Sequence, residues 1–171
     1  MTVMPFARVA ASMMFMVAPT ETMSRYTWPP ARRPPPGTLS LIHIYLAATG
    51  ITCQDFGTDS TESCDYPAFG KAAAQAVASG QCQWGIVICT TGIGISIAAN
   101  KVRGIRCALC GDPLSASLTR RHNNANMLAM GAGIVGKNLA ENIVDTFLNT
   151  QFEGGRHERR VNALMAIEND W

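Results

Sequence analysis

One stretch of this 171-residue chain decides its fold: Trp84-Gly-Ile-Val-Ile-Cys-Thr-Thr-Gly-Ile-Gly-Ile-Ser-Ile-Ala-Ala-Asn-Lys101. Its beginning, Gly85 to Ile88, is a short apolar run rich in β-branched residues, which is typical of a strand buried on both faces. Thr90 to Gly94 follows, and its glycines let the backbone turn sharply and come close to a ligand. Ile95 to Lys101 can begin a helix. The stretch therefore predicts a strand, a glycine-bearing loop and a helix in succession.

This loop is a candidate anion site with a reactive residue beside it. We expect the loop amides and the positive end of the helix dipole to face one point, so that a phosphate or an enolate oxygen is held there without a metal. Cys89 stands where the strand should end. Because a thiol in such a position can serve as a base, we expect Cys89 to be the reactive group of the site.

The rest of the chain alternates between helix and strand. The expected helices cover residues 41–49, 69–79, 113–121, 137–149 and 156–168, and the expected strands cover residues 51–56, 105–110 and 127–130. Leu139, Ile143 and Phe147 have the spacing of a helix stripe packed on a sheet. This order predicts an α/β fold with a Rossmann-like, doubly wound, mostly parallel sheet flanked by helices. Ligands of such sheets bind beyond the carboxyl ends of the strands, where Cys89 is expected to lie.

The first forty residues read differently from the rest. Val9 to Ala18 is an apolar run that is too short to span a bilayer, and Ala18-Pro19 would be a poor cleavage site for a targeting segment. Trp28 to Gly37 is rich in proline, which excludes regular structure and predicts an extended linker. We therefore expect residues 1–40 to be an irregular, poorly ordered extension and residues 41–171 to be the folded domain.

Composition excludes several classes of function. The formal net charge is +2, with 47% hydrophobic and 15% charged residues, so nothing in the balance indicates a nucleic-acid or membrane partner. The six cysteines are expected to be reduced thiols in a cytoplasmic protein, because a domain of this size has a sufficient core without disulfides. Cys107 and Cys110 have the spacing of half a zinc site, but a strand would point them to opposite faces. No metal is expected.

We expect three polar constellations to lie near the edge of the sheet that carries Cys89. Residues 120–126, which contain His122, read either as a site or as a helix C-terminus with an Asn-rich turn. Arg156 and Arg160 lie one helical turn apart and can converge on an anion, or form a solvated helix face. Tyr66 either belongs to a helix start or lines one side of a sugar-sized pocket.

Together these segments resemble the ribose-5-phosphate isomerase B family. The resemblance is carried by D-Y-P at 65–67, G-I-V-I-C-x-T-G-I-G-I-S-I-A-A-N-K at 85–101, G-I-R at 104–106, R-H-N-x-A-N at 121–126 and F-E-G-G-R-H-x-x-R at 152–160. It covers about residues 45–171. The related galactose-6-phosphate isomerase subunits share the loop but typically lack the last two motifs, so the ribose enzyme is favoured.

The resemblance implies a metal-free, cofactor-free aldose–ketose isomerase that interconverts ribose 5-phosphate and ribulose 5-phosphate in the pentose phosphate pathway. Cys89 would move a proton between C1 and C2 through a cis-enediolate. Amides around Thr90, Gly92 and Gly94 would hold the oxyanion. Thr91 would assist proton exchange at the substrate oxygens.

The same resemblance assigns the other half of the site. His122 would open the furanose ring, and Asn123 and Tyr66 would line the sugar site. Arg156 and Arg160 would bind the phosphate. Family members are homodimers or tetramers whose sites take residues from two chains, so the resemblance implies a homo-oligomer.

The sequence departs from the family pattern in its first segment and at three other positions. Family members open with a strand that ends in Gly-x-Asp-His, but counting back from Gly50 reaches Arg32-Arg33. The motif is absent, and we expect the place of that strand to stay empty, since the linker geometry argues against Phe6 to Val17 filling it. The other departures are Thr90 where the family usually has Gly, Asn124 for a usual Asp, and Gly133 for a phosphate-binding Arg.

These departures leave alternatives open. One is a catalytically silent homologue that binds sugar phosphates, and another is the product of a damaged gene whose reading frame changes upstream of about Tyr45. A galactose-6-phosphate isomerase subunit is a further alternative.

Overall fold

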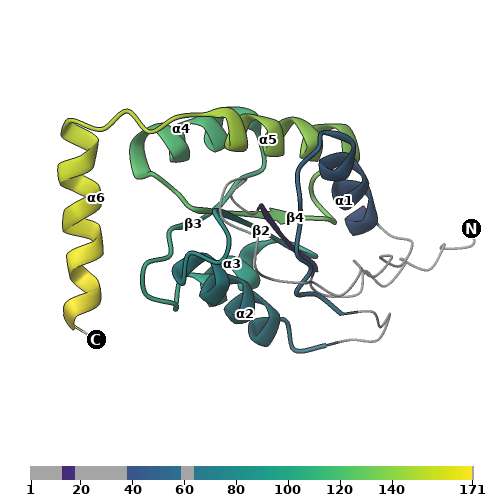
Figure 1. Cartoon of the computed structure of the whole chain (residues 1–171), viewed down its shortest axis with the longest axis horizontal. Coiled ribbons are helices and arrows are strands. Elements are labelled where there is room, and N and C mark those ends of the chain that lie inside the picture. Colours follow the sequence, from purple (N-terminus) through teal and green to yellow (C-terminus); the bar gives the residue numbers. More distant parts are fainter. Residues whose placement is uncertain (1–12, 18–37, 59–63, 171) are drawn as a thin grey trace, which may run out of the picture.

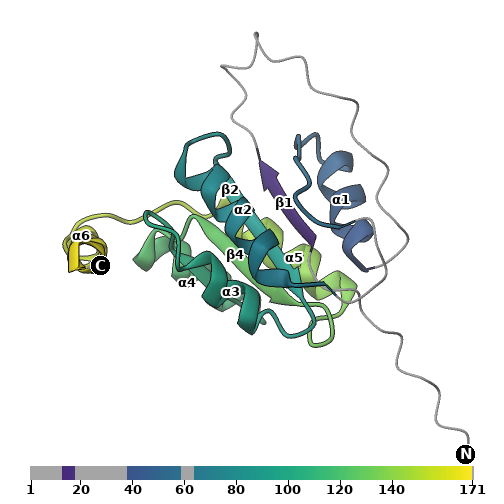
Figure 2. The same cartoon turned by 90° about the horizontal axis from the view of Figure 1, so that it is seen from below.

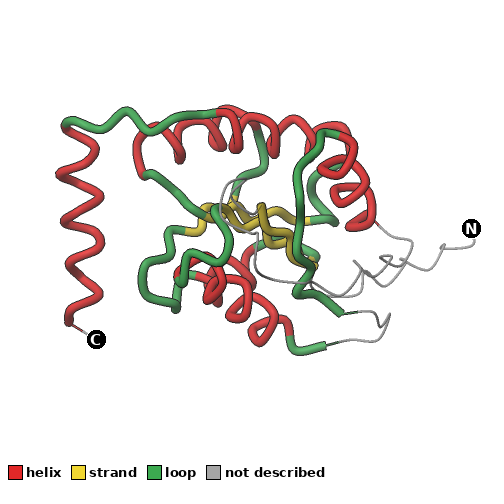
Figure 3. The backbone as a smooth tube through the Cα atoms, viewed as in Figure 1, coloured by secondary structure: helices red, strands yellow, loops and turns green. Residues whose placement is uncertain are grey.

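The computed structural model describes residues 13–17, 38–58 and 64–170. In chain order the described elements are β1 (Met13–Val17), α1 (Thr38–Ala48), α2 (Tyr66–Ala78), β2 (Trp84–Cys89), α3 (Ile93–Ala99), β3 (Cys107–Leu109), α4 (Pro113–Asn123), β4 (Met127–Gly131), α5 (Lys137–Asn149), α6 (Arg156–Ala166) and the 3-10 turn η1 (Ile167–Asp170). Figure 1 shows the strands enclosed between helices, and Figure 3 shows the same layers by type of secondary structure.

The sheet has the order β1-β2-β4-β3. β2, β4 and β3 are parallel, with Gly85 opposite Met127 and Cys89 opposite Gly131. Helical crossovers join them, as parallel neighbours require. The chain therefore has a parallel three-stranded centre flanked by helices, and this confirms the predicted fold class.

β1 corrects the expectation that the place beside β2 stays empty. Met13–Val17 pairs with β2 in the antiparallel sense, and Phe15 stands opposite Ile86. A bare edge of β2 would leave backbone N–H and C=O groups without partners, and an apolar segment can supply them. The rest of that prediction concerns residues 6–12 and the proline-rich linker within residues 18–37, and these lie outside the described residues.

Each face of the sheet is covered by its own helices, as Figures 1 and 2 show. Side chains alternate between the faces along a strand. Ile86 and Ile88 pack with α1, α4 and α5 in one core cluster. Val87 and Cys89 pack with α2 and α3 in the other. The candidate base is thus fixed by the α2–α3 layer.

α5 has the bounds expected from the sequence, Lys137–Asn149. Its buried stripe includes Ile143 and Phe147, as predicted, but begins at Ala140, whereas Leu139 is exposed. The stripe is one residue out of phase at its start because i, i+4 spacing drifts against the 3.6-residue turn.

The expected strand at residues 51–56 is wrong, because only a single bridge forms there, at Cys53. Instead, Gly50 has a positive φ of 78° and the Ile51 N–H donates to the Leu46 carbonyl oxygen at 2.9 Å, which closes α1. The strand expected at 105–110 is shorter, Cys107–Leu109.

α6 stands apart from both helix layers, beyond β3 (Figure 1). Its buried residues are His157 and Val161. Beyond its end, both carboxylate oxygens of Glu168 accept the Gly104 N–H at 3.0 Å. None of the helices in the described ranges combines the length and the apolar character needed to span a bilayer.

Candidate active site

Cys89 is the last residue of β2 and is 8% exposed. Its sulfur accepts the backbone N–H of Gly92 at 3.1 Å. Gly92 has a φ of 77°, a left-handed conformation that suits glycine, and it immediately precedes α3. The hydroxyl of Thr91 accepts the Ile93 N–H at 3.3 Å. The thiol therefore lies inside the turn that links strand and helix, within reach of a loop amide.

The end of β4 holds this loop. Ala132 and Gly133 donate their backbone N–H groups to the carbonyl oxygens of Cys89 and Thr90, each at 2.9 Å. A Cβ placed on Gly131 would lie 2.6 Å from the Thr91 carbonyl oxygen, which is a steric clash with backbone. The glycine thus permits a close approach of two loops and fixes the position of Thr91.

Two of the unusual positions in the sequence contact each other in this region. A Cβ on Gly133 would lie 3.1 Å from the Thr90 carbonyl oxygen and 3.5 Å from Thr90 Cγ2. The Thr90 side chain therefore lies next to the space that a side chain at position 133 would occupy.

Tyr66, the first residue of α2, packs on the loop from the other side. A Cβ on Gly94 would lie 2.6 Å from Tyr66 Cζ, so only glycine leaves room for the ring. Tyr66 also borders the cluster that contains Cys89. Cys89, Thr90, Thr91, Gly92, Gly94 and Tyr66 therefore form one group at the carboxyl ends of the strands.

A second group surrounds the end of α4, where two arginines hold the turn that follows His122. Arg120, 3% exposed, donates to the Ala125 carbonyl oxygen at 2.6 Å and to Asn124 Oδ1 at 3.0 Å. Its guanidinium lies 4.0 Å from the Trp84 ring centroid. Burial, together with the charge of Arg106, lowers the pKa of Arg120 to about 10.

Arg106 holds the same turn from the β3 side. Its Nε donates to the carbonyl oxygens of Asn123 and Asn124 at 3.2 and 3.0 Å. Asn124 has a φ of 46° and ends the helix in the left-handed conformation that asparagine tolerates. The predicted helix C-terminus is therefore present, and it presents His122 and Asn123.

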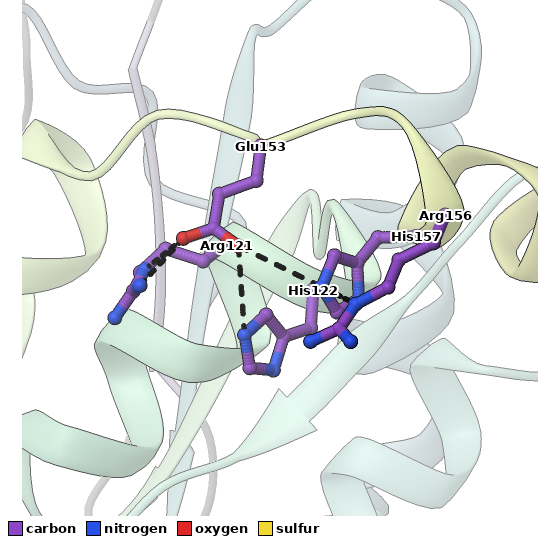
Figure 4. A network of polar contacts seen from close by, with 5 residues as sticks. All are labelled: Arg121, His122, Glu153, Arg156 and His157. Carbon is purple, nitrogen blue, oxygen red and sulfur yellow. Dashed lines mark hydrogen bonds and ion pairs between the residues drawn. The ribbon is translucent and has the colours of Figure 1, made fainter.

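Figure 4 shows how α4 and α6 meet through the side chains near His122. The rings of His122 and His157 are stacked, with centroids 4.2 Å apart and planes within 3°. Nε2 of both imidazoles faces Glu153, at 3.7 Å from His122 and 3.6 Å from His157. Arg156 Nε donates to His157 Nε2 at 3.3 Å.

The pKa values of Glu153 and His157 are shifted by the groups around them. A hydrogen bond from Arg121 holds the pKa of Glu153 below its ordinary value, and the charges of Arg121 and the two histidines act in the same direction. Burial lowers the pKa of His157, with further contributions from His122 and Arg156, while Glu153 opposes the shift. Glu153 is therefore an anion among cationic and basic groups.

His122, Glu153 and His157 are also a set of potential metal ligands, since one ligand atom from each lies within 4.8 Å of the others. The ring geometry does not favour a metal. A metal binds imidazole in the plane of the ring, and two rings stacked within 3° cannot direct their in-plane lone pairs at one point. Arg121 also already engages Glu153. The arrangement suits a network of charged hydrogen-bonding groups.

The two groups lie at opposite ends of the parallel strands: the Cys89 group at the carboxyl ends and the His122 group at the amino ends. The expectation that all constellations lie near Cys89 is therefore wrong for those of α4 and α6. Gly85, at the start of β2, donates its N–H to the Asn126 carbonyl oxygen at 3.1 Å. Cys89 is about 13 Å further along the strand at roughly 3.3 Å per residue. A turn between a helix and the next parallel strand lies at the amino edge, which is where His122 and Asn123 are found. Arg156 and Arg160 are exposed on α6, and Arg156 contacts His157, whose ring stacks on that of His122.

Sequence reasoning gave no role to Glu153 and His157. The available signal was their i, i+4 spacing across the start of α6, directly beside the arginine pair. Their contacts with α4, thirty residues earlier, have no local signature.

Known proteins resemble this chain in sequence and in fold. Residues 39–164 match the family described as Ribose/Galactose Isomerase. The chain is 52% identical to ribose-5-phosphate isomerase B of Escherichia coli K12 over 127 residues, which are 74% of this chain and 85% of that protein. The structure of Clostridium thermocellum ribose-5-phosphate isomerase B is similar, with a TM-score of 0.77 and 51% identity over 78% of this chain and 90% of that one. The Mycoplasma genitalium enzyme with bound ribulose-5-phosphate gives a TM-score of 0.75 and 35% identity over the same shares.

Proposed function

Because this chain belongs to the ribose/galactose isomerase family, we propose that it interconverts ribose 5-phosphate and ribulose 5-phosphate. The observation that carries this proposal is the position of the Cys89 sulfur inside the glycine loop, 3.1 Å from the Gly92 nitrogen. A thiol and backbone amides of the loop lie together there, and proton transfer next to a carbonyl requires a base and such hydrogen-bond donors.

In the proposed reaction the Cys89 thiolate removes the C2 proton of the open-chain aldose. Electrons move into the C1 carbonyl and give a cis-enediolate, whose oxyanion the amides of residues 90–94 stabilise. The proton returns to C1, and the O2 proton passes to O1 with help from the Thr91 hydroxyl. Ketose forms with no change in atoms or oxidation level of the whole molecule, so no step requires a cofactor or a metal.

His122, Asn123, Arg156 and Arg160 form the other half of the proposed site. His122 would transfer the proton that opens the furanose ring, while Asn123 would bind the sugar hydroxyls. Arg156 and Arg160 project from one face of α6 and would bind the phosphate, since two guanidinium groups can engage its oxygens together.

The offset between the halves supports a site shared by two copies of the chain. Within one protomer Cys89 and the His122 turn are separated by about the length of β2. A symmetric dimer can place the α4–α6 group of one protomer against the loop of its partner. We therefore propose a homodimer, or a tetramer built from such dimers, as the active form.

We also propose that the enzyme acts in the cytoplasm, in the pentose phosphate pathway. All six cysteines are free thiols, which a reducing compartment favours.

A second candidate function is sugar-phosphate binding without turnover. The observation that favours it is the absence of a Gly-x-Asp-His segment, since the strand beside β2 is Met-Met-Phe-Met-Val. Binding and chemistry are separable here, because the arginines of α6 do not depend on that strand.

A ribose 5-phosphate isomerisation assay on the full chain and on Cys89→Ala tests the proposal. Turnover by the unmodified chain, lost by at least about a hundred-fold in Cys89→Ala, is the expected result. Calorimetric binding of ribose 5-phosphate without turnover would favour the second candidate. Galactose 6-phosphate as a competing substrate distinguishes the two activities of the family.

A further inference from the structure

The carboxylate of Glu153 uses its two oxygens for different partners. Oε1 accepts from Arg121 Nε at 2.6 Å and lies 2.5 Å from Arg121 Nη2. Oε2 faces Nε2 of both His122 and His157. The backbone N–H of Glu153 donates to the Arg121 carbonyl oxygen at 3.1 Å. Glu153 is thus fixed through its backbone and through one oxygen, and this leaves the other oxygen directed at the imidazole pair (Figure 4).

The carboxylate lies 3.7 Å from His122 Nε2, beyond hydrogen-bond distance, but its charge acts on that nitrogen. An anion facing Nε2 favours the tautomer that carries hydrogen on Nε2, which leaves the Nδ1 lone pair to exchange a proton with a substrate. The stack with His157 restricts rotation of the ring. The stack therefore restricts the orientation of the ring, and the carboxylate favours one of its tautomers.

Glu153 is also the anion among the charged groups around this imidazole. Arg121 belongs to the same helix as His122, and α6 contributes His157 and Arg156. Without the carboxylate these groups would repel one another. The contact between α4 and α6 would then lose the anion that interacts with side chains of both helices.

We propose that Glu153 is the positioning residue for His122 in ring opening. The inference rests on the proposed isomerase function and adds a residue to it. In the ring-opening step the O1–H bond and the C1–O4 bond break, C1=O1 forms, and the proton reaches O4 by way of His122 Nδ1. Glu153 does not touch the sugar in this step; it holds the imidazole that does.

Ring opening can be measured apart from the chemistry at C1 and C2. Ribulose 5-phosphate has its C5 oxygen esterified and so cannot close a furanose ring. Exchange of its C1 proton with deuterium oxide requires Cys89 and phosphate binding but no ring-opening step. A group that acts only through His122 should affect conversion of ribose 5-phosphate and leave this exchange intact.

The experiment compares Glu153→Gln and Glu153→Ala with the matched surface variant Glu158→Gln, whose exposed carboxylate lies on the first turn of α6. Gln keeps the shape of the side chain and removes its charge. Each variant is assayed for conversion of ribose 5-phosphate and, by NMR, for C1 deuterium exchange of ribulose 5-phosphate. Circular dichroism checks that each is folded.

We expect both Glu153 variants to lose about ten-fold or more in conversion while exchange stays within about two-fold, and Glu158→Gln to change neither. A parallel fall of both rates would overturn the inference, because it would assign Glu153 to the fold or the phosphate site. Unchanged conversion in Glu153→Gln would overturn it as well. Failure of the proposed function is a different result, since the unmodified chain itself would then show neither rate.

Discussion

Gly85 and Asn126 are joined by a backbone hydrogen bond of 3.1 Å, and this contact places the His122 turn at the start of β2, whereas Cys89 ends that strand. The two proposed halves of the site therefore belong to opposite edges of one protomer. This separation is the reason for proposing a site that two protomers share.

A shared site predicts complementation between inactive variants. Cys89→Ala and Arg160→Ala should each be inactive alone, because every site in either homodimer lacks one half. After co-refolding of an equal mixture, half of the dimers are mixed, and each mixed dimer has one intact site. We expect activity to return to roughly a quarter of that of the unmodified protein, measured as ribose 5-phosphate turnover.

The double variant Cys89→Ala/Arg160→Ala provides the control. Mixed with Cys89→Ala it leaves no intact loop in any dimer, so no activity should appear. If the mixture of single variants also stays inactive while forming dimers in solution, the site lies within one chain and the composite arrangement is wrong.

The sequence predicted the parts of this site that depend on local pattern. The run that ends at Cys89, the turn at Gly92 and the bounds of α5 all follow from apolar periodicity and glycine placement, which act over a few residues. Tyr66 was also expected beside the loop, and the fit of its ring over Gly94 agrees with that expectation.

Long-range features were beyond that reasoning for physical reasons. The contact of Glu153 with Arg121 and His122 joins segments about thirty residues apart through side chains, which periodicity does not encode. The pairing of Met13–Val17 with β2 depends on which edge is free after the sheet has formed. The edge on which His122 lies was predictable, however, because a turn that precedes a parallel strand lies at the amino edge.

Gly131→Ala should displace the loop that carries the proposed oxyanion amides. The new Cβ would lie 2.6 Å from the Thr91 carbonyl oxygen, and backbone cannot yield as a flexible side chain can. We expect turnover to fall by roughly a hundred-fold, because a displacement of the loop by up to about 1 Å misplaces its amides. Overpacking should also lower the free energy of unfolding by about 1–3 kcal/mol in urea titration.

Gly136→Ala is the matched control for that substitution. Its Cβ would meet nothing within 4 Å, and its φ of −73° suits alanine. Turnover should stay within about two-fold. The free energy of unfolding should fall by no more than about 1 kcal/mol, because Gly136 is the N-cap of α5 and alanine caps a helix less well than glycine. Equal effects of the two substitutions would show that the close approach at Gly131 is not what fixes the loop.

Stability should fall on acidification through Glu153. Arg121 holds the pKa of this carboxyl below its ordinary 4.5, so its stabilising contribution is complete above that value and is lost as pH falls through the folded pKa. The lowered pKa of His157 acts with the same sign, beginning below its ordinary 6.5, because protonation is less favourable in the folded chain.

Thermal unfolding of the unmodified chain and of Glu153→Gln between neutral and acidic pH measures the carboxyl contribution. At neutral pH the Tm of the unmodified chain should be higher than that of Glu153→Gln. This difference between the two proteins should disappear at a pH low enough to protonate Glu153. A constant difference across the range would assign the effect to shape and not to charge.

Alkylation should distinguish Cys89 from the structural thiols. Burial raises the pKa of Cys53, Cys82 and Cys110 to about 11 and that of Cys107 to about 12, so these sulfurs remain protonated and unreactive near pH 8. Cys89 lies in the loop turn with an amide N–H directed at its sulfur. We expect iodoacetamide to inactivate the enzyme in step with labelling of Cys89, followed by mass spectrometry of tryptic peptides, and ribose 5-phosphate to slow both. Loss of activity that follows labelling of Cys64 instead, with Cys89 unmodified, would remove Cys89 from the role of base.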